Sequence, residues 1–168
     1  MHGEPIARPR CRAFTLLEAL VAAAVLAFVV AAITQAVAAG QAQNHQVLHE
    51  VRAVSLAEAM MEEVLAAPYE DPDGASSEGP DSGESRRDLF DNADDWGGYT
   101  ESPGTLADHA GAAYPEPFQI FTRSVTAKYQ TVNLPTLGQC SGLQVVVTVR
   151  DSHDRAWTIS RFVPEPAP

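Results

Sequence analysis

The stretch RAFTLLEALVAAAVLAFVVAAI, residues 12–33, decides the fold class. It carries no polar side chain from Ala19 to Ile33, and its apolar character continues to Ala39. As a helix rising about 1.5 Å per residue, it spans most of a hydrocarbon core of about 30 Å. Glu18 stands near its start, although a lone carboxylate in hydrocarbon is costly. We therefore expect a membrane segment in which this carboxylate has a specific purpose.

Charge is distributed unevenly along the chain, which has 22 acidic and 11 basic residues. Residues 1–13 hold three arginines and one glutamate, a net charge of +2, and the remainder therefore carries −13. Basic residues before an apolar segment favour a cytoplasmic N-terminus, so the C-terminal part is expected to be exported. The acidity of that part argues against nucleic-acid binding, because few cations are present to neutralise phosphates.

Two ordinary interpretations of the N-terminal segment are open. A secretory signal peptide would have a basic start, an apolar core and the small-residue site Ala36-Val37-Ala38. A single-pass anchor would need only the apolar segment and its flanking charges. Neither interpretation explains Glu18, nor why the helical pattern continues beyond Gly40.

A third interpretation explains both features. The residues Arg12 to Glu18, RAFTLLE, followed by the apolar run, resemble the processing site of type IV prepilins and type II secretion pseudopilins. The resemblance implies that a leader, residues 1–13, is cut off before Phe14 by the prepilin peptidase and that the new amine is methylated. Ala13 stands where the family normally has glycine.

The resemblance also implies how the chain assembles. Residues 14–39 would form the transmembrane and filament-core helix, with the chain anchored in the inner membrane and its C-terminal domain outside the cytoplasm. Expected partners are other pilin or pseudopilin subunits and the inner-membrane assembly platform. Glu18, as the fifth mature residue, would face the N-terminal amine of a neighbouring subunit, since an opposite charge lowers the cost of a carboxylate in an apolar bundle. The other expected assembly residues are Thr15, Leu16 and Leu17.

The helix is expected to continue through residues 40–67 and to end at Pro68, giving one helix over Phe14–Ala67 with Gly40 as a weak point. Helical spacing places one apolar stripe on it, and we expect this stripe to face the sheet. His45 and His49 lie almost opposite, which predicts a solvated face rather than a metal site. The stripe consists of Val47, Val51, Val54, Met61 and Leu65.

Residues 68–115 read as an acidic loop region rich in glycine, proline and serine. Asp91, Asp94 and Asp95 lie within five positions beside aromatic residues, a density of oxygen ligands that suits calcium, although the spacing is not that of an EF-hand. A solvated acidic turn with an aromatic anchor is the alternative. No other cofactor is expected.

The segments LAEAMMEEVLAAPYEDPDG and GPDSGESRRDLFDNADDWGGYTESP resemble minor pilins of the mannose-sensitive haemagglutinin (MSHA) type. With the N-terminal motif, this resemblance covers residues 12–103. The chain departs from that subfamily at Trp96-Gly97, where an aromatic–histidine pair is expected.

Residues 116–168 have the composition of strands and predict a small antiparallel sheet head. The expected strands are Phe118–Val132, Leu143–Val149 and Ala156–Val163, with a loop at Leu134–Gly142 that contains Cys140 and a hairpin turn at Asp151–Asp154. A sheet packed on the long helix predicts an α+β, type IV pilin-like fold.

The chain is not expected to be an enzyme. It has no glycine-rich phosphate loop, nucleophile elbow or Cys/His metal cluster, and Ser152-His153-Asp154 are too close in sequence to form a triad. The predicted function is a structural subunit, a minor pilin or pseudopilin of a type IV pilus or type II secretion-like filament. The alternative is a membrane-anchored or secreted binding module, calcium-dependent or not, without a filament role.

Overall fold

The computed structural model describes residues 15–72, 74, 78–135 and 138–166. The predicted leader and the processing pair, Ala13 and Phe14, lie outside the described residues. The chain divides into two compact units, residues 1–46 and 47–168.

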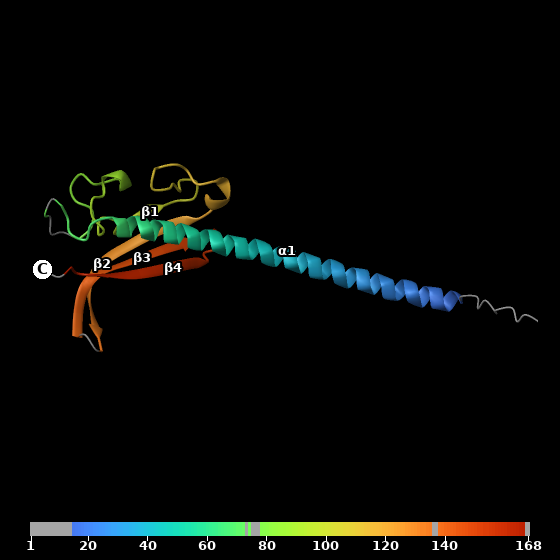
Figure 1. The fold of residues 1–168 in the computed structure, drawn as a ribbon. Helices are drawn as coiled ribbons and strands as arrows, with labels where there is room; N and C mark the ends of the chain where they lie inside the picture. The colour runs from blue at the N-terminus through green and yellow to red at the C-terminus, as the bar shows by residue number, and fades with distance from the viewer. Residues whose placement is uncertain (1–14, 73, 75–77, 136–137, 167–168) are drawn as a thin grey trace, which may run out of the picture. The chain divides into compact units, whose positions relative to one another are not determined.

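Helix α1 runs from Leu16 to Ala66 (Figure 1). Its first turn is capped by Thr15, whose hydroxyl accepts a hydrogen bond from the Glu18 backbone N–H at 3.3 Å. It ends just before Pro68, where a proline cannot continue the helix. Gly40, the predicted weak point, lies inside the continuous helix.

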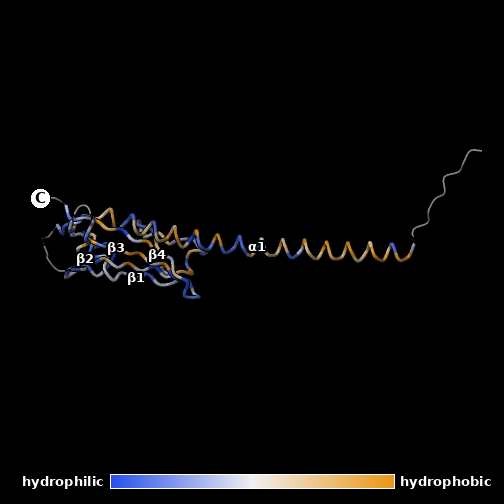
Figure 2. Tube along the Cα trace, turned by 90° about the horizontal axis from the view of Figure 1, so that it is seen from below, coloured by the Kyte–Doolittle hydropathy of each residue, from blue (hydrophilic) through white to orange (hydrophobic). Residues whose placement is uncertain are grey.

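In the first unit, the described part of α1 is apolar and exposed. Every residue from 15 to 46 is exposed except Gly40, which is half-buried. Figure 2 shows mostly apolar colour along the N-terminal part of α1. Within this unit, α1 therefore buries no side chain against its own chain.

In the second unit, four antiparallel strands form one sheet in chain order, and the rest of α1 packs on it (Figure 1). The core comes from aliphatic side chains of β2 and β3 and from small or flexible side chains of α1. This is the α+β, pilin-like fold that the sequence predicts. The strands are β1 Thr100–Glu101, β2 Thr122–Leu134, β3 Gly138–Arg150 and β4 Ala156–Pro164.

The predicted packing face of the helix is wrong except at Met61, the one residue of the predicted stripe that is buried; Leu65 is 41% exposed. Val47, Val51 and Val54 are 52%, 55% and 36% exposed. The buried face lies about 100° around the helix, at 100° per residue. Small alanine and flexible methionine side chains allow the helix to approach the sheet closely. The prediction had chosen the valines because they are more hydrophobic than alanine. The buried residues of α1 are Ala53, Leu56, Ala57, Met60, Met61 and Val64.

The predicted loop Leu134–Gly142 is also wrong. β2 and β3 pair without interruption from Thr122↔Arg150 to Leu134↔Gly138, so most of this segment belongs to a long hairpin. Gly138 has a φ of +80°, which lets the chain reverse tightly at that point. The turn predicted at Asp151–Asp154 is confirmed, because β3 ends at Arg150 and β4 begins at Ala156.

The described residues between 68 and 115 contain more regular structure than a loop region suggests. They contain the short helix η1, Arg87–Leu89, and strand β1, and a second short helix, η2, follows at Glu116–Phe118. Trp96 and Leu106 from this region are buried in the core. The region is therefore part of the packed head.

Candidate functional site

The predicted assembly residues Thr15, Leu16, Leu17 and Glu18 form the cap and first turn of α1. The Leu16 and Leu17 side chains are 84% and 72% exposed. Glu18 lies in the first turn, where the helix dipole favours a negative charge. The segment thus presents an apolar surface with one carboxylate near its end.

The exposed apolar surface continues along the first unit of the chain. Leu20, Leu26, Phe28 and Ile33 are all between 58% and 78% exposed. Soluble monomeric proteins rarely expose contiguous apolar surfaces of this size, and such surfaces mark contacts with a membrane or with another protein. Helix α1 is also long and apolar enough to cross a membrane. The chemistry of this surface therefore suits a lipid bilayer or other apolar helices.

The acidic loop brings together a different set of carboxylates from the predicted one. Oxygen atoms of Glu84, Asp91 and Asp95 lie within 4.8 Å of one another. Asp94 is not part of this group, because its oxygens accept from the Tyr129 hydroxyl at 3.2 Å and the Gly79 N–H at 3.0 Å. Burial raises the pKa of Asp94 above its ordinary value, and these two hydrogen bonds oppose the effect.

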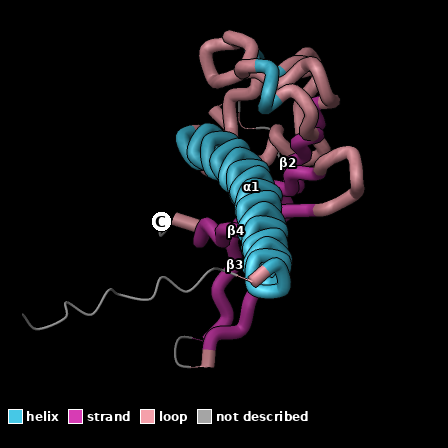
Figure 3. The backbone as a smooth tube through the Cα atoms, turned by 90° about the vertical axis from the view of Figure 1, so that its right-hand side faces the viewer, coloured by secondary structure: helices cyan, strands magenta, loops and turns pink. Residues whose placement is uncertain are grey.

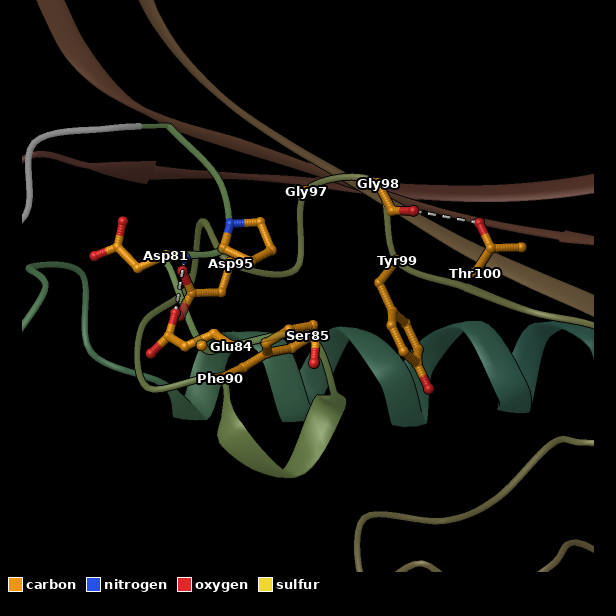
Figure 4. A pocket seen from close by; sticks show the side chains of 11 residues that line it. Asp81, Glu84, Ser85, Phe90, Asp95, Gly97, Gly98, Tyr99 and Thr100 are labelled. Carbon is orange, nitrogen blue, oxygen red and sulfur yellow. Dashed lines mark hydrogen bonds between the residues drawn. The ribbon is translucent and has the colours of Figure 1, made fainter.

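A cavity of about 530 Å³ lies beside these carboxylates (Figure 4). Glu84 and Asp95 lie together at one end and Tyr99 at the other. One oxygen of Asp95 already accepts the backbone N–H groups of Asp91 and Asn92, at 3.0 and 3.1 Å. The carboxylates can hold a cation, but Asp95 also shapes its own turn.

The prediction that His49 faces solvent is wrong. Its Nε2 lies 3.0 Å from an Asp151 carboxylate oxygen, and its ring packs against those of Phe121 and Trp157, with centroid distances of 4.7 and 5.6 Å. His45 is exposed, as predicted. The error follows from the wrong helix face, since the true buried face includes the position of His49.

Asp151 is a buried carboxylate at the start of the β3–β4 turn. Burial alone would raise its pKa, but hydrogen bonds from Arg155, from the His153 N–H and from His49 lower the pKa well below its usual range. Arg155 Nε donates to the same Asp151 oxygen at 2.8 Å. The ionised carboxylate therefore ties α1 to the turn.

A buried ionic network connects the helix, the loop region and the sheet. Arg123 is 1% exposed and donates to Glu101 at 2.7 Å and to the Leu56 carbonyl at 3.3 Å. Arg87 donates to Glu101 at 3.1 Å and pairs with Glu63 on α1. Nothing in the sequence identifies this network, because its ion pairs join residues 14 to 24 positions apart and Arg123 lies 67 positions from Leu56.

No triad geometry is present in the β3–β4 turn. The Ser152 hydroxyl lies 3.3 Å from His153 Nδ1, but Asp154 pairs with Arg150 instead. Cys140 is half-buried on β3 and makes no disulfide with a described residue.

The comparisons with known proteins identify one segment. Residues 8–34 match the family described as the prokaryotic N-terminal methylation motif. No curated protein matches the chain, and no solved structure does so either. Such a motif implies processing by a prepilin peptidase.

The motif, the long N-terminal helix and the antiparallel sheet together support a type IV prepilin-like protein. Pilin-like proteins are usually structural rather than enzymatic. The apolar start of α1 is consistent with membrane anchoring of such a protein.

Proposed function

We propose that the chain is a structural subunit, a minor pilin or pseudopilin, of a type IV pilus or type II secretion-like filament. The observation that carries the proposal is the methylation motif at residues 8–34, which leads directly into the exposed apolar part of α1. The motif accounts for processing before Phe14, and the exposed helix accounts for assembly. The two features are needed together in a subunit that leaves the membrane for a filament.

In this proposal Glu18 recognises a neighbouring subunit. Its carboxylate sits at an apolar helix start, where an unpaired charge is costly once water is excluded. The methylated amine of Phe14 in another subunit would supply the opposite charge. Pairing the two charges would set the register between neighbouring helices.

The apolar part of α1 would hold the subunit in the inner membrane before assembly. Arginines 8, 10 and 12 precede it, so the N-terminus would be cytoplasmic and the head would lie outside the cytoplasm. The prepilin peptidase and an inner-membrane assembly platform are the other proposed partners. A non-closing contact between identical or related helices produces a helical filament.

The resemblance to MSHA-type minor pilins over residues 12–103 favours a low-abundance subunit that primes or caps the filament. In that role the acidic loop region would lie at the surface of the assembly. The packed loop region gives the head a defined surface to present, because Trp96 and Leu106 anchor it in the core.

Replacing Glu18 by leucine tests the role of its charge. Membrane insertion should be retained, since leucine favours hydrocarbon, while recovery of the chain in sheared filaments should fall at least about tenfold if a buried charge pair is lost. Glu58→Leu is the matched control, because Glu58 is an exposed glutamate of the same helix outside the membrane segment. Equal recovery of both variants would contradict the pairing role.

A second candidate function, an anchored calcium-binding module without a filament, is favoured by the grouping of Glu84, Asp91 and Asp95. Calcium bound to the folded head would stabilise it by mass action. Thermal melting with and without millimolar calcium checks this, with Asp95→Asn as the variant expected to lose any shift. An unchanged melting temperature argues against the site.

A further inference from the structure

The two edges of the sheet differ in how they are covered. On the β1 side, the residues just before β1 also bond to β2: the Gly98 N–H donates to the Val125 carbonyl at 3.1 Å, and the Val125 N–H donates to the Tyr99 carbonyl at 2.9 Å. A side chain on Gly97 would lie 3.2 Å from the Ala127 carbonyl oxygen, so the backbone packs tightly against this edge. On the other side β4 is the last strand, and no described strand pairs with its outer edge (Figures 1 and 3).

The outer edge of β4 has few of the devices that proteins use to blunt an edge. All nine residues pair one-to-one with β3, so the strand contains no bulge. Its sequence AWTISRFVP has a single charge, Arg161, and its proline is the last residue. A long, regular strand with a mostly uncharged edge is a template for pairing with another extended chain.

The register identifies which backbone groups point outward. Glu165 N–H donates to the Ser141 carbonyl, and Asp151 N–H donates to the Arg155 carbonyl. Hydrogen-bonded pairs alternate in an antiparallel ladder. The backbone N–H and C=O groups of odd-numbered residues of β4 therefore point toward β3, and those of even-numbered residues point away from it. The outward backbone N–H groups therefore belong to Ala156, Thr158, Ser160 and Phe162.

Arg161 indicates the charge of the chain that this edge would take. Its guanidinium is on an exposed residue and donates to the Ser160 carbonyl at 3.0 Å, and it makes no ion pair with a described residue. Pairing of β4 with a second copy about a twofold axis at Ser160 would bring two Arg161 side chains close together. Like charges across strands are destabilising, whereas a carboxylate on the incoming strand would pair with Arg161.

We propose that the outer edge of β4 is a binding site for an extended segment of a different protein that carries a carboxylate opposite Arg161. The segment adds as a fifth strand through the outward N–H groups of Thr158, Ser160 and Phe162. This site does not depend on filament formation, because it uses neither the N-terminal motif nor the apolar part of α1.

The test uses the full chain in detergent and a labelled nine-residue peptide. The peptide alternates threonine and valine around a central glutamate, and alternate amides are N-methylated so that only one edge can pair and the peptide cannot stack on itself. A second peptide has lysine in place of glutamate. Fluorescence anisotropy measures binding to the wild type and to Ser160→Pro, Ser160→Ala and Arg161→Glu.

We expect saturable binding of the glutamate peptide by the wild type. Ser160→Pro removes an outward donor without removing a bond to β3, and should weaken binding at least about tenfold, whereas Ser160→Ala should stay within about twofold. Arg161→Glu should lower the affinity for the glutamate peptide about tenfold and raise the affinity for the lysine peptide by a similar factor. Circular dichroism verifies folding, and the Arg161 charge swap decides the question if the proline variant fails to fold.

Three results would overturn the proposal. One is no saturable binding by the folded wild type at millimolar peptide. Another is a failed substitution test: either folded Ser160→Pro and Ser160→Ala bind the glutamate peptide with equal affinity, or Arg161→Glu does not exchange the preference between the two peptides. The third is a dimer of the chain that Ser160→Pro abolishes without any peptide binding, which would assign the edge to a second copy. A failed peptide test would leave Phe14 methylation untouched, so the two proposals fail separately.

Discussion

The two parts of helix α1 contrast in what they do with similar apolar content. From residue 16 to residue 46 the helix is rich in leucine, valine and alanine, and none of these side chains is buried by the chain itself. From residue 47 to Ala66 it buries a narrow face of alanine, leucine, methionine and one valine, Val64, against the sheet. Apolar composition therefore does not determine where a side chain finds its contacts. The described side chains of the first part are left exposed, with a surface that suits a bilayer or other apolar helices, and those of the second pack on the sheet.

This contrast predicts that substitutions in the two parts have different consequences. Changes at the second part should act on the stability of the head, whereas changes at the first should act on membrane insertion and assembly. Unfolding of the head can be followed by tryptophan fluorescence in detergent, because Trp96 is buried in its core.

The largest expected effect is that of Arg123→Ala. Removing this side chain leaves Glu101 buried without its main partner and frees the Leu56 carbonyl of α1, so the free energy of unfolding should fall by about 3 to 5 kcal/mol. Arg86→Ala is the control: Arg86 and Asp88 form an exposed pair, so this variant should leave the free energy of unfolding nearly unchanged. Similar costs for both variants would show that the buried network does not hold the head to α1.

A matched pair of leucines tests the contrast directly. Leu56 is 1% exposed and Leu26 is 65% exposed. Leu56→Ala should lower the free energy of unfolding by about 2 to 5 kcal/mol, whereas Leu26→Ala should change it by no more than about 0.5 kcal/mol. Denaturant unfolding measures both values. If Leu26→Ala destabilised the head as much as Leu56→Ala, the division of α1 into two parts would be refuted.

A smaller effect is expected at the link between His49 and Asp151. Hydrogen bonds hold the folded-state pKa of Asp151 below its unfolded value near 3.9. The ionised carboxylate therefore contributes fully to the free energy of unfolding above that pH, and this contribution is lost as the pH falls below it. Asp151→Asn should lower the free energy of unfolding by about 1.5 to 3 kcal/mol at neutral pH, and by less as the pH falls below about 4. Asp154→Asn, at an exposed pair, is the control. A cost for Asp151→Asn that does not change with pH would exclude this linkage.

The sequence predicted the long helix, the three main strands and the last hairpin, because each rests on a local pattern. It did not predict the packing face of α1, because spacing alone cannot distinguish exposed valines from buried alanines such as Ala53 and Ala57. The place of His49 was missed for the same reason. The network around Arg123 joins residues that are distant in sequence, and no local signal marks them.

At the candidate site, the N-terminal motif could be recognised from the sequence because its residues are consecutive. Thr15 to Glu18, which form the cap and first turn of α1, belong to that motif. The acidic group was only partly anticipated. Asp91 and Asp95 lie together, but Glu84 takes the place expected for Asp94, which instead bonds to Tyr129. That exchange depends on how the loop folds back on itself, which composition does not encode.

The mass of the mature N-terminal peptide tests the central claim most directly. The chain is extracted from membranes, digested and analysed by mass spectrometry. The account predicts a peptide that begins at Phe14 with a methylated amine. A mature chain that begins near Ala39, or one that retains residues 1–13, would contradict it.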